Sequence, residues 1–453
     1  MHYSDFNVAI LGFGVEGQDA ARYFLGQKSK RIVVFDKRSK VEVVGRQWWG
    51  TGVEWVCGPD YLKGGIHGFD IVVRSPGFYR YLPEIVEAEK QGSKVTSNTT
   101  LFFEESEANI IGVTGTKGKG TTTQMLKLAL EAGGKKVLLL GNIGTPMLDR
   151  IDDADTFDWV ILELSSFQLI DLPYSPPIAV VTNIKTDHLN WHKDRKEYVN
   201  AKKNLWIHQK PTDWVVFNQD DETSRELAKD APGHVVWFNA GDKESKGNWG
   251  DLGVGGNHNM ANANAALAAA KVAGLDEEVA WQGICKFTGS EHRMEMVAEV
   301  GGVQYINDSA ATTPEAAIAA LESFEQTKIL IVGGSLKGVA FKGYAQAIKE
   351  NNVKTVFLIG DSAEEIKVEL NKVGYKGTVK DGIEGMKRIV EEIYKVAVPG
   401  DAVLLLPACA SFGLFKDYKD RGDKFKEAVH NLSSLRRQGS KNCHPRESGE
   451  LYK

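Results

Sequence analysis

Glycines, lysines and threonines alternate in GTKGKGTT at residues 115–122, and these residue types suit the binding of phosphate. Glycines let backbone N–H groups converge on phosphate oxygens at the start of a helix, and a lysine such as Lys119 brings charge to the β- and γ-phosphates of a nucleotide. The usual phosphate loop has four residues between its first glycine and its Gly-Lys pair. Here Gly115 and Gly118 enclose only two. The segment therefore predicts a variant nucleotide-binding loop.

A magnesium site is expected beside this loop. The residue after the lysine usually offers a hydroxyl to Mg²⁺, but Gly120 stands there, so we assign that role to Thr121. Glu163 ends the apolar run WVILE at 159–163, where a carboxylate ligates Mg²⁺ directly or through water. Capping a helix is an equally common use of such a residue, and this alternative stays open. The loop residues expected to bind ATP are Gly115, Thr116, Lys117, Gly118, Lys119, Gly120, Thr121 and Thr122.

A second phosphate-binding pattern lies near the N-terminus. Gly12, Gly14 and Gly17 follow one apolar run and open a helical pattern, and Asp36 ends the next run. This arrangement is typical of a dinucleotide-binding turn. A glycine-rich turn without a ligand is the alternative, and the second phosphate loop downstream argues against a purely NAD-binding enzyme. The pattern predicts a phosphorylated nucleotide without identifying it.

Strands and helices must position these residues. Short apolar runs, usually followed by glycine and a helical pattern, recur along the chain. They lie at 7–14, 31–36, 71–77, 109–116, 136–142, 159–164, 178–184, 328–334, 355–360 and 402–407. Continuous apolar strands between helices are typical of parallel sheets covered on both faces, which predicts an α/β fold. Ligands of such folds bind at the carboxyl ends of the strands, where the glycines and polar residues stand.

The chain, at 453 residues, is too long for one core. Polar breaks at 105–110 and 287–295 indicate three domains. We expect the first and third to be Rossmann-like and the central one to be a P-loop ATPase-like parallel sheet. A final stretch without apolar periodicity is expected to be a disordered tail. The predicted segments are 1–108, 109–289, 290–432 and the tail at 433–453.

Composition narrows the class of protein. Apolar residues make up 42% and charged residues 25%, as in soluble globular proteins. A net charge of −5 argues against a broad nucleic-acid surface. The four cysteines form no CxxC pair, which disfavours a disulfide scaffold or zinc site and fits a reducing cytoplasm. No signal-peptide pattern and no apolar run near the ~20 residues of a membrane span are present. We expect a cytoplasmic monomer without membrane insertion.

Taken in order, the motifs resemble those of the Mur ligase family, ATP-dependent enzymes that form amide bonds in peptidoglycan synthesis. The likeness spans nearly all of residues 7–430. It rests on GTKGKGTT, NIGTP, ELSSFQL, TDHLNWH, YVNAKKNL, NHNMANANAAL, EHRMEMV, NDSAATTPEA and ACASFGLFKDYKDRGDKF. The N-terminal glycine unit, ELSSFQL and PACASF bring the chain nearest to members that add D-glutamate to UDP-N-acetylmuramoyl-L-alanine (UDP-MurNAc-L-Ala).

The resemblance implies a mechanism with ATP and Mg²⁺ as cofactors. ATP phosphorylates the terminal carboxylate of the UDP-linked substrate, giving an acyl phosphate and ADP. The amine of the incoming glutamate then attacks that carbon, and phosphate leaves. Magnesium and lysine screen the repulsion between the carboxylate and the γ-phosphate.

The resemblance also implies the residues of the site. Lys119, Glu163, His188 and Lys202 would be catalytic, although a lone histidine is more often structural than a ligand. Thr121 and Glu163 would hold one Mg²⁺, and His188 and Lys202, the lysine as a carbamate, a second. ATP would also meet Asn259, Asn262, Arg293 and Asp308. The UDP substrate would lie near Gly14, Asp36, Lys37, Arg38, Ser75, Gly77, Asn142 and Ser165. Lys337, Ser411 and Tyr418 would bind glutamate.

Two positions depart from the family pattern. Gly120 replaces the usual Ser or Thr, and Ala310 replaces a lysine close to the glutamate and ATP sites. The loss of that cation leaves addition of L-glutamate, by the same chemistry, as an alternative. An NAD-dependent oxidoreductase and a non-catalytic nucleotide-binding module are alternatives of other classes.

Overall fold

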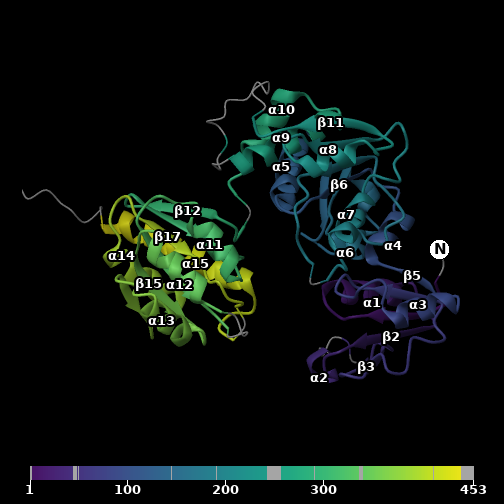
Figure 1. The fold of residues 1–453 in the computed structure, drawn as a ribbon, viewed down its shortest axis with the longest axis horizontal. Helices are drawn as coiled ribbons and strands as arrows, with labels where there is room; N and C mark the ends of the chain where they lie inside the picture. Colours follow the sequence, from purple (N-terminus) through teal and green to yellow (C-terminus); the bar gives the residue numbers. More distant parts are fainter. Residues whose placement is uncertain are drawn as a thin grey trace, which may run out of the picture. The chain divides into compact units, whose positions relative to one another are not determined.

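The computed structural model describes residues 3–43, 48, 50–143, 145–189, 191–241, 252, 257–289, 291–335, 340–411 and 413–439. The chain divides into two compact units, Met1–Phe287 and Thr288–Lys453 (Figure 1). The first unit contains two sheets and the second contains one.

The first sheet has the strand order β3-β2-β1-β4-β5, and every neighbouring pair is parallel. Its strands are buried because they consist of short apolar runs covered on both faces. Phe24 of α1 and Leu101 of α4 pack on one face, and Ile85 of α3 packs on the other. The elements are β1 (Asn7–Leu11), α1 (Val15–Gly26), β2 (Arg31–Asp36), α2 (Lys40–Val43), β3 (Glu54–Cys57), β4 (Ile71–Arg74), α3 (Pro83–Lys90), β5 (Lys94–Thr96) and α4 (Asn98–Glu105).

The second sheet is also parallel throughout, in the order β11-β10-β9-β6-β8-β7. Helices α5, α9 and α10 pack together on one face, and α6 and α7 contribute to the core on the other (Figure 1). The strands are β6 (Ile110–Thr114), β7 (Val137–Gly141), β8 (Trp159–Glu163), β9 (Ile178–Val181), β10 (Trp214–Asn218) and β11 (His234–Phe238). The helices are α5 (Lys119–Ala132), α6 (Ser166–Leu169), α7 (Arg195–Lys203), α8 (Glu222–Ala228), α9 (Asn257–Val272) and α10 (Glu277–Ile284), with short 3-10 turns η2 (Leu148–Arg150) and η3 (Ala154–Thr156).

Buried polar contacts join the two sheets of the first unit. Asp19 of α1 accepts hydrogen bonds from the backbone N–H groups of Leu148 (3.0 Å) and Asp149 (2.8 Å). Arg74, at the end of β4, is fully buried and pairs with Asp171 at 2.7 Å. Buried and partnered charges of this kind restrict relative movement, because separation would expose or unpair them. The first and second sheets are therefore held in one body.

The third sheet has the order β12-β13-β17-β14-β15-β16. Its one antiparallel pair is β12 with β13, and the other pairs are parallel. Helices α11, α12 and α13 cover one face, and α14 and α15 cover the other. The elements are β12 (Glu295–Val300), β13 (Val303–Asn307), α11 (Pro314–Leu321), β14 (Lys328–Gly333), α12 (Lys342–Glu350), β15 (Val353–Ile359), α13 (Ala363–Lys372), β16 (Thr378–Lys380), α14 (Met386–Val396), β17 (Ala402–Leu405) and α15 (Tyr418–Gly439).

The predicted α/β class is confirmed. The boundary predicted at residue 108 falls between α4 and β6, inside the first compact unit. Helix α15 continues to Gly439, past residue 433 where we expected the tail to begin, and residues 440–453 lie outside the described part of the chain. Within the described residues, no helix is both long and apolar enough to cross a membrane.

Candidate active site

The loop that joins β6 to α5 depends on two glycines. Gly115 and Gly118 have φ angles of 153° and 86°, which disfavour other residues. A Cβ on Gly118 would lie 2.2 Å from Oδ1 of Asn262, and one on Gly115 would lie 1.9 Å from Oγ1 of Thr182. The glycines therefore let the loop pack closely against α9 and against the end of β9.

This loop presents a helix N-terminus and a lysine to the same space. Lys119 is the first residue of α5, and its Nζ donates to the carbonyl oxygens of Gly115 (3.0 Å) and Thr116 (3.1 Å). The first N–H groups of a helix have no acceptor within it, and the helix dipole favours an anion there. The arrangement fits the phosphates of a nucleotide. Thr116 and Lys117 lie in the loop, and Thr122 donates to Oδ1 of Asn262 at 3.4 Å.

Lys202 of α7 reaches the same loop from another direction. Its side chain is only 2% exposed, and its Nζ donates to the carbonyl oxygen of Gly115 at 2.7 Å. The amine also lies 4.9 Å from the ring centre of Tyr198. Burial, and then the nearby charge of Lys119, hold the pKa of Lys202 well below its usual range. An amine in this setting is readily deprotonated.

Glu163 faces the first turn of α5 from the end of β8. Its Oε1 accepts a hydrogen bond from Nδ2 of Asn142 at 2.8 Å. A Cβ on Gly120 would lie 3.1 Å from Oε2 of Glu163, so a larger residue at position 120 would crowd the carboxylate. Thr121, which is half-buried, follows directly in α5. Glu163 does not cap α6, because the hydroxyl of Ser165 does so.

His188 and Lys202 both lie near the ring of Tyr198. The His188 and Tyr198 ring centres are 6.3 Å apart, and Tyr198 also meets the Lys202 amine. The His188 side chain is 45% exposed, with φ at 53° and its ring 4.8 Å from Phe167. His188 is therefore accessible to a ligand.

The sequence reading did not single out His192, four positions after His188. Its ring is buried, with Nε2 2.9 Å from Oγ of Ser166 and Nδ1 3.3 Å from Oε2 of Glu197. Burial lowers the pKa of His192, which favours a neutral ring. The residue links α6 to α7, and its only sequence signal was its place in TDHLNWH.

The residues predicted to hold Mg²⁺ supply few protein ligands. In the described part of the chain, no three His, Cys, Asp or Glu side chains gather as a metal cluster. The Thr121 hydroxyl and Glu163 carboxylate are hard oxygen donors, and Mg²⁺ commonly takes its other ligands from phosphates and water. The donor set fits a magnesium ion that arrives with a nucleotide.

The N-terminal candidates gather at the carboxyl edge of the first sheet. Gly14 caps the start of α1, and Ser75 donates to the carbonyl oxygen of Gly12 at 3.2 Å. Burial alone would raise the pKa of Asp36, but Arg38 and the Phe13 N–H hold it at about 2. The Asp36 carboxylate is thus engaged within the protein and shapes the turn. Lys37 is exposed, and the carbonyl oxygen of Gly77 accepts from Nε1 of Trp191 at 3.4 Å.

Glu16 is a site-adjacent residue that the sequence reading missed. Its Oε1 accepts from Nε2 of Gln168 at 2.7 Å, which joins α1 to α6 beside Ser165. Burial raises the pKa of Glu16 to about 7, and its Oε2 is buried without a hydrogen-bond partner among the described residues. A carboxylate in the first turn of a helix is common, so the sequence did not predict that Glu16 bonds Gln168, 152 residues away.

The remaining candidates lie elsewhere. Asn259 is half-buried in α9 of the first unit. In the second unit Asp308 is buried, which raises its pKa to about 6, and Ser411 is buried too. Arg293 is exposed, as is Tyr418 at the start of α15. Lys337 lies outside the described residues.

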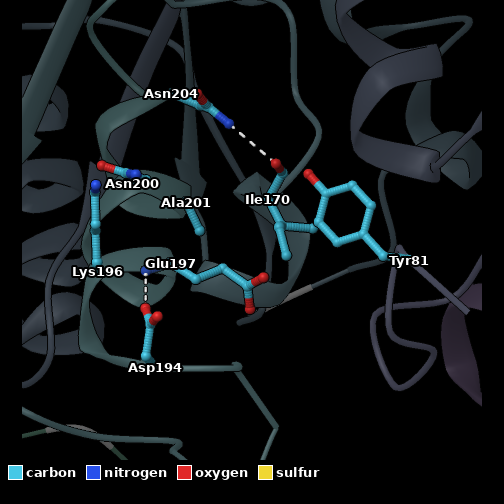
Figure 2. A pocket seen from close by; sticks show the side chains of 8 residues that line it. All are labelled: Tyr81, Ile170, Asp194, Lys196, Glu197, Asn200, Ala201 and Asn204. Atoms are coloured by element: carbon cyan, nitrogen blue, oxygen red, sulfur yellow. Dashed lines mark hydrogen bonds between the residues drawn. The ribbon is translucent and has the colours of Figure 1, made fainter.

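A cavity of about 380 Å³ opens beside α7 (Figure 2). Its lining residues are Tyr81, Ile170, Asp194, Lys196, Glu197, Asn200, Ala201 and Asn204. Figure 2 shows Asp194 bonded to the N–H of Glu197, and Asn204 bonded to the carbonyl oxygen of Ile170. The Glu197 carboxylate in turn accepts from Tyr79 at 2.7 Å. Since these groups already have partners within the protein, we assign no ligand to this cavity.

Comparison with known proteins identifies the chain. Residues 113–252 match the Mur ligase middle domain, and residues 292–409 match the Mur ligase, glutamate ligase domain. The UDP-N-acetylmuramoylalanine–D-glutamate ligase of Acetivibrio thermocellus is 37% identical, covering 94% of this chain and 97% of the relative. The chain belongs to the Mur ligase family. The ligase of the same name from Symbiobacterium thermophilum is 36% identical to this Mur ligase over 94% of the chain and 98% of the relative.

Solved structures share the fold of this Mur ligase. The UDP-N-acetylmuramate–alanine ligase MurC of Thermotoga maritima aligns with a TM-score of 0.56 at 19% identity, over 94% of this chain and 99% of that one. The MurF ligase of Thermotoga maritima in complex with ADP aligns with a TM-score of 0.53 at 16% identity, over 95% and 96% of the two chains.

Proposed function

We propose that this Mur ligase adds D-glutamate to UDP-MurNAc-L-Ala in the synthesis of peptidoglycan precursors, with cleavage of ATP to ADP and phosphate. The full-length likeness to D-glutamate ligases supports the substrates. The observation that carries the proposal is the convergence of Lys119, Lys202 and Glu163 around the start of α5 and the loop before it. This family membership disfavours the oxidoreductase alternative.

The residues around the loop suit activation of a carboxylate. ATP supplies the phosphoryl group that turns the carboxylate oxygen into a leaving group, and Mg²⁺ neutralises charge on the phosphates. Lys119 and the first turn of α5 would orient the phosphates, and Glu163 and Thr121 would hold the metal. Glu163, which faces the first turn of α5, accepts a hydrogen bond from Asn142, the proposed contact to the sugar substrate.

We propose that Lys202 is carbamylated in the active enzyme. Burial and the charge of Lys119 disfavour the ammonium form of Lys202, which would have no lone pair to offer a metal. Reaction of its neutral amine with CO₂ forms an N–C bond and releases one proton, leaving an anionic carbamate with two oxygen ligands. His188 and this carbamate would then bind a second Mg²⁺.

The other site assignments belong to the same proposal. Three sheets would act as three domains, for the UDP substrate, for ATP and for glutamate. Gly14, Arg38 and Ser75 at the edge of the first sheet support the first assignment. Asp308 and Ser411 follow β13 and β17 at the carboxyl edge of the third sheet, where ligands of such sheets bind.

Phosphate release from ATP tests the function. We expect sustained release only when UDP-MurNAc-L-Ala and D-glutamate are both present, because the amine is needed to clear the acyl phosphate. L-Glutamate is measured in parallel, since Ala310 stands where the family has a lysine. Equal release without either substrate would indicate a plain ATPase, and a preference for L-glutamate would overturn the assigned chirality.

A further inference from the structure

A fully buried cation lies in the second unit outside the residues assigned above. Arg421 of α15 is 0% exposed. Its Nε donates to Oγ of Ser309 (2.9 Å), its Nη2 to the carbonyl oxygen of Ser309 (2.8 Å), and its Nη1 to the carbonyl oxygen of Cys409 (3.1 Å). Among the described residues, no carboxylate pairs with it. Burial lowers the pKa of Arg421 to about 10, so it remains charged at neutral pH.

These bonds bring together loops at the carboxyl edge of the third sheet. Ser309 directly follows Asp308 after β13, and Cys409 stands two residues before Ser411 after β17. The loop after β14 is tied to the same place, because the N–H of Ser335 donates to the carbonyl oxygen of Ala410 at 2.9 Å. Arg421 therefore lies behind the loops that present the proposed ATP and glutamate contacts.

Close packing fixes the start of α15 against a further segment. A Cβ on Gly422 would lie 2.1 Å from Nδ1 of His292, the residue before Arg293. Glycine at this position therefore lets α15 approach the segment before β12, and Arg421 is held at a set depth. The position of Arg421 therefore depends on the packing of α15.

Burial of an unpaired guanidinium is costly, and hydrogen bonds to neutral groups offset the cost only in part. Lys328, in the same unit, is a buried cation with a purely structural role and serves as the comparison. Lys328 is 1% exposed at the amino end of β14 and donates to the carbonyl oxygens of Gln326 (3.0 Å) and Asn351 (2.8 Å). Arg421 differs in its place, since it lies at the ligand-binding edge of the sheet.

We propose that Arg421 is a positioning residue for the incoming amino acid, which it serves by joining the loops that carry Asp308 and Ser411 and by lending positive charge to this edge of the sheet. The inference rests on the proposed function, since it takes the amino acid to be an anion. Arg421 acts through the loops and does not touch the substrate.

Steady-state kinetics of Arg421→Lys and Arg421→Gln test the proposal. The lysine keeps the charge and loses part of the hydrogen bonding, whereas glutamine keeps donors and loses the charge. We expect the KM for glutamate to rise about tenfold in the first and by up to about a hundredfold in the second, as for loss of a hydrogen bond to a charged group. The KM for UDP-MurNAc-L-Ala, whose proposed contacts lie in the first unit, should change less than about twofold.

Lys328→Met is the matched control. It removes another buried cation from the same unit, so it should lower the melting temperature and leave every KM unchanged. If the Arg421 variants behave in the same way, Arg421 is purely structural and the proposal is overturned. If they do not fold, Ser309→Ala removes the hydroxyl that accepts from Nε and donates to the carbonyl oxygen of Tyr418 at 2.7 Å. This variant should still raise the KM for glutamate about threefold, and an unchanged KM would overturn the proposal. Failure of the wild type to ligate glutamate would instead refute the proposed function.

Discussion

Single residues carry the chemistry of this enzyme, and Lys202 offers the sharpest test. Its amine is buried against the phosphate loop, whereas the next residue, Lys203, pairs with Asp230 at the surface. Lys202→Ala should lower kcat at least about a hundredfold with the fold intact, because a metal ligand and a charge at the phosphate loop are lost. Lys203→Ala should change kcat less than about twofold and stability by less than about 1 kcal/mol. Near-normal turnover of Lys202→Ala, purified free of wild type, would refute the assignment.

The carbamate itself can be examined in the unaltered enzyme. Depletion of CO₂ and bicarbonate should lower activity, and their return should restore it, since the carbamate forms reversibly from the neutral Lys202 amine. ¹³C-Bicarbonate should give a carbamate NMR signal in the wild type and none in Lys202→Ala. Identical ¹³C spectra for the two proteins would contradict carbamylation.

Glu16 makes stability depend on pH in a specific direction. Burial raises its pKa from 4.5 to about 7, so the folded state binds the proton more tightly than the unfolded state. Its contribution is therefore complete below about pH 4.5 and declines as the pH rises to about 7. Glu16→Gln should raise the free energy of unfolding by about 1 to 3 kcal/mol at pH 8 and have little effect at pH 4. Denaturant titrations at the two pH values measure this.

The exposed residue Glu107 provides the control for Glu16. Glu107→Gln should change stability by less than about 0.5 kcal/mol at either pH, as is usual for surface substitutions. An equal response of the two variants would show that burial of Glu16 between α1 and α6 has no effect on folding.

At the scale of elements, the start of α5 depends on contact with α9. Gly118→Ala places a Cβ at positive φ and 2.2 Å from Asn262, so it should both destabilise the protein and weaken binding of an ATP analogue more than tenfold. Gly134, which follows α5, has φ at 74° but open space around it. Gly134→Ala should lower the free energy of unfolding by about 1 kcal/mol, through backbone strain alone, and leave nucleotide affinity unchanged. Calorimetric titration that finds equal affinities for both variants would contradict the role of the α5–α9 contact.

At the scale of the whole molecule, two compact units with separate cores predict separate folding. Fragments 1–287 and 288–439 should each show native circular dichroism and a cooperative thermal transition. The first fragment should bind an ATP analogue, because the loop before α5 and its neighbours all lie within it. It should not ligate, since Asp308 and Ser411 belong to the second unit. Ligation by fragment 1–287 alone would refute the proposed division of labour.

Local sequence signals predicted many strands of this fold, although β3, β5, β10, β11 and β16 lie outside the predicted apolar runs. Apolar runs became strands and the glycines of GTKGKGTT became a strand–loop–helix turn, because a buried strand and a tight turn depend on neighbouring residues. The class was therefore evident without coordinates. The antiparallel pairing of β12 with β13 and the extension of α15 to Gly439 were not predicted. Strand pairing and helix length also depend on packing partners.

The sequence by itself determined which residue types stand at the ends of strands, and the tertiary structure decided which of them meet. Lys202 reaches Gly115 across 87 positions of the chain, Asn262 packs against Gly118, and Arg421 joins Ser309 to Cys409. Such contacts follow from the order of strands in each sheet, here β9-β6-β8 around the phosphate loop. Strand order is set by long crossover connections and by the burial of whole helix faces, and no short segment encodes either of them.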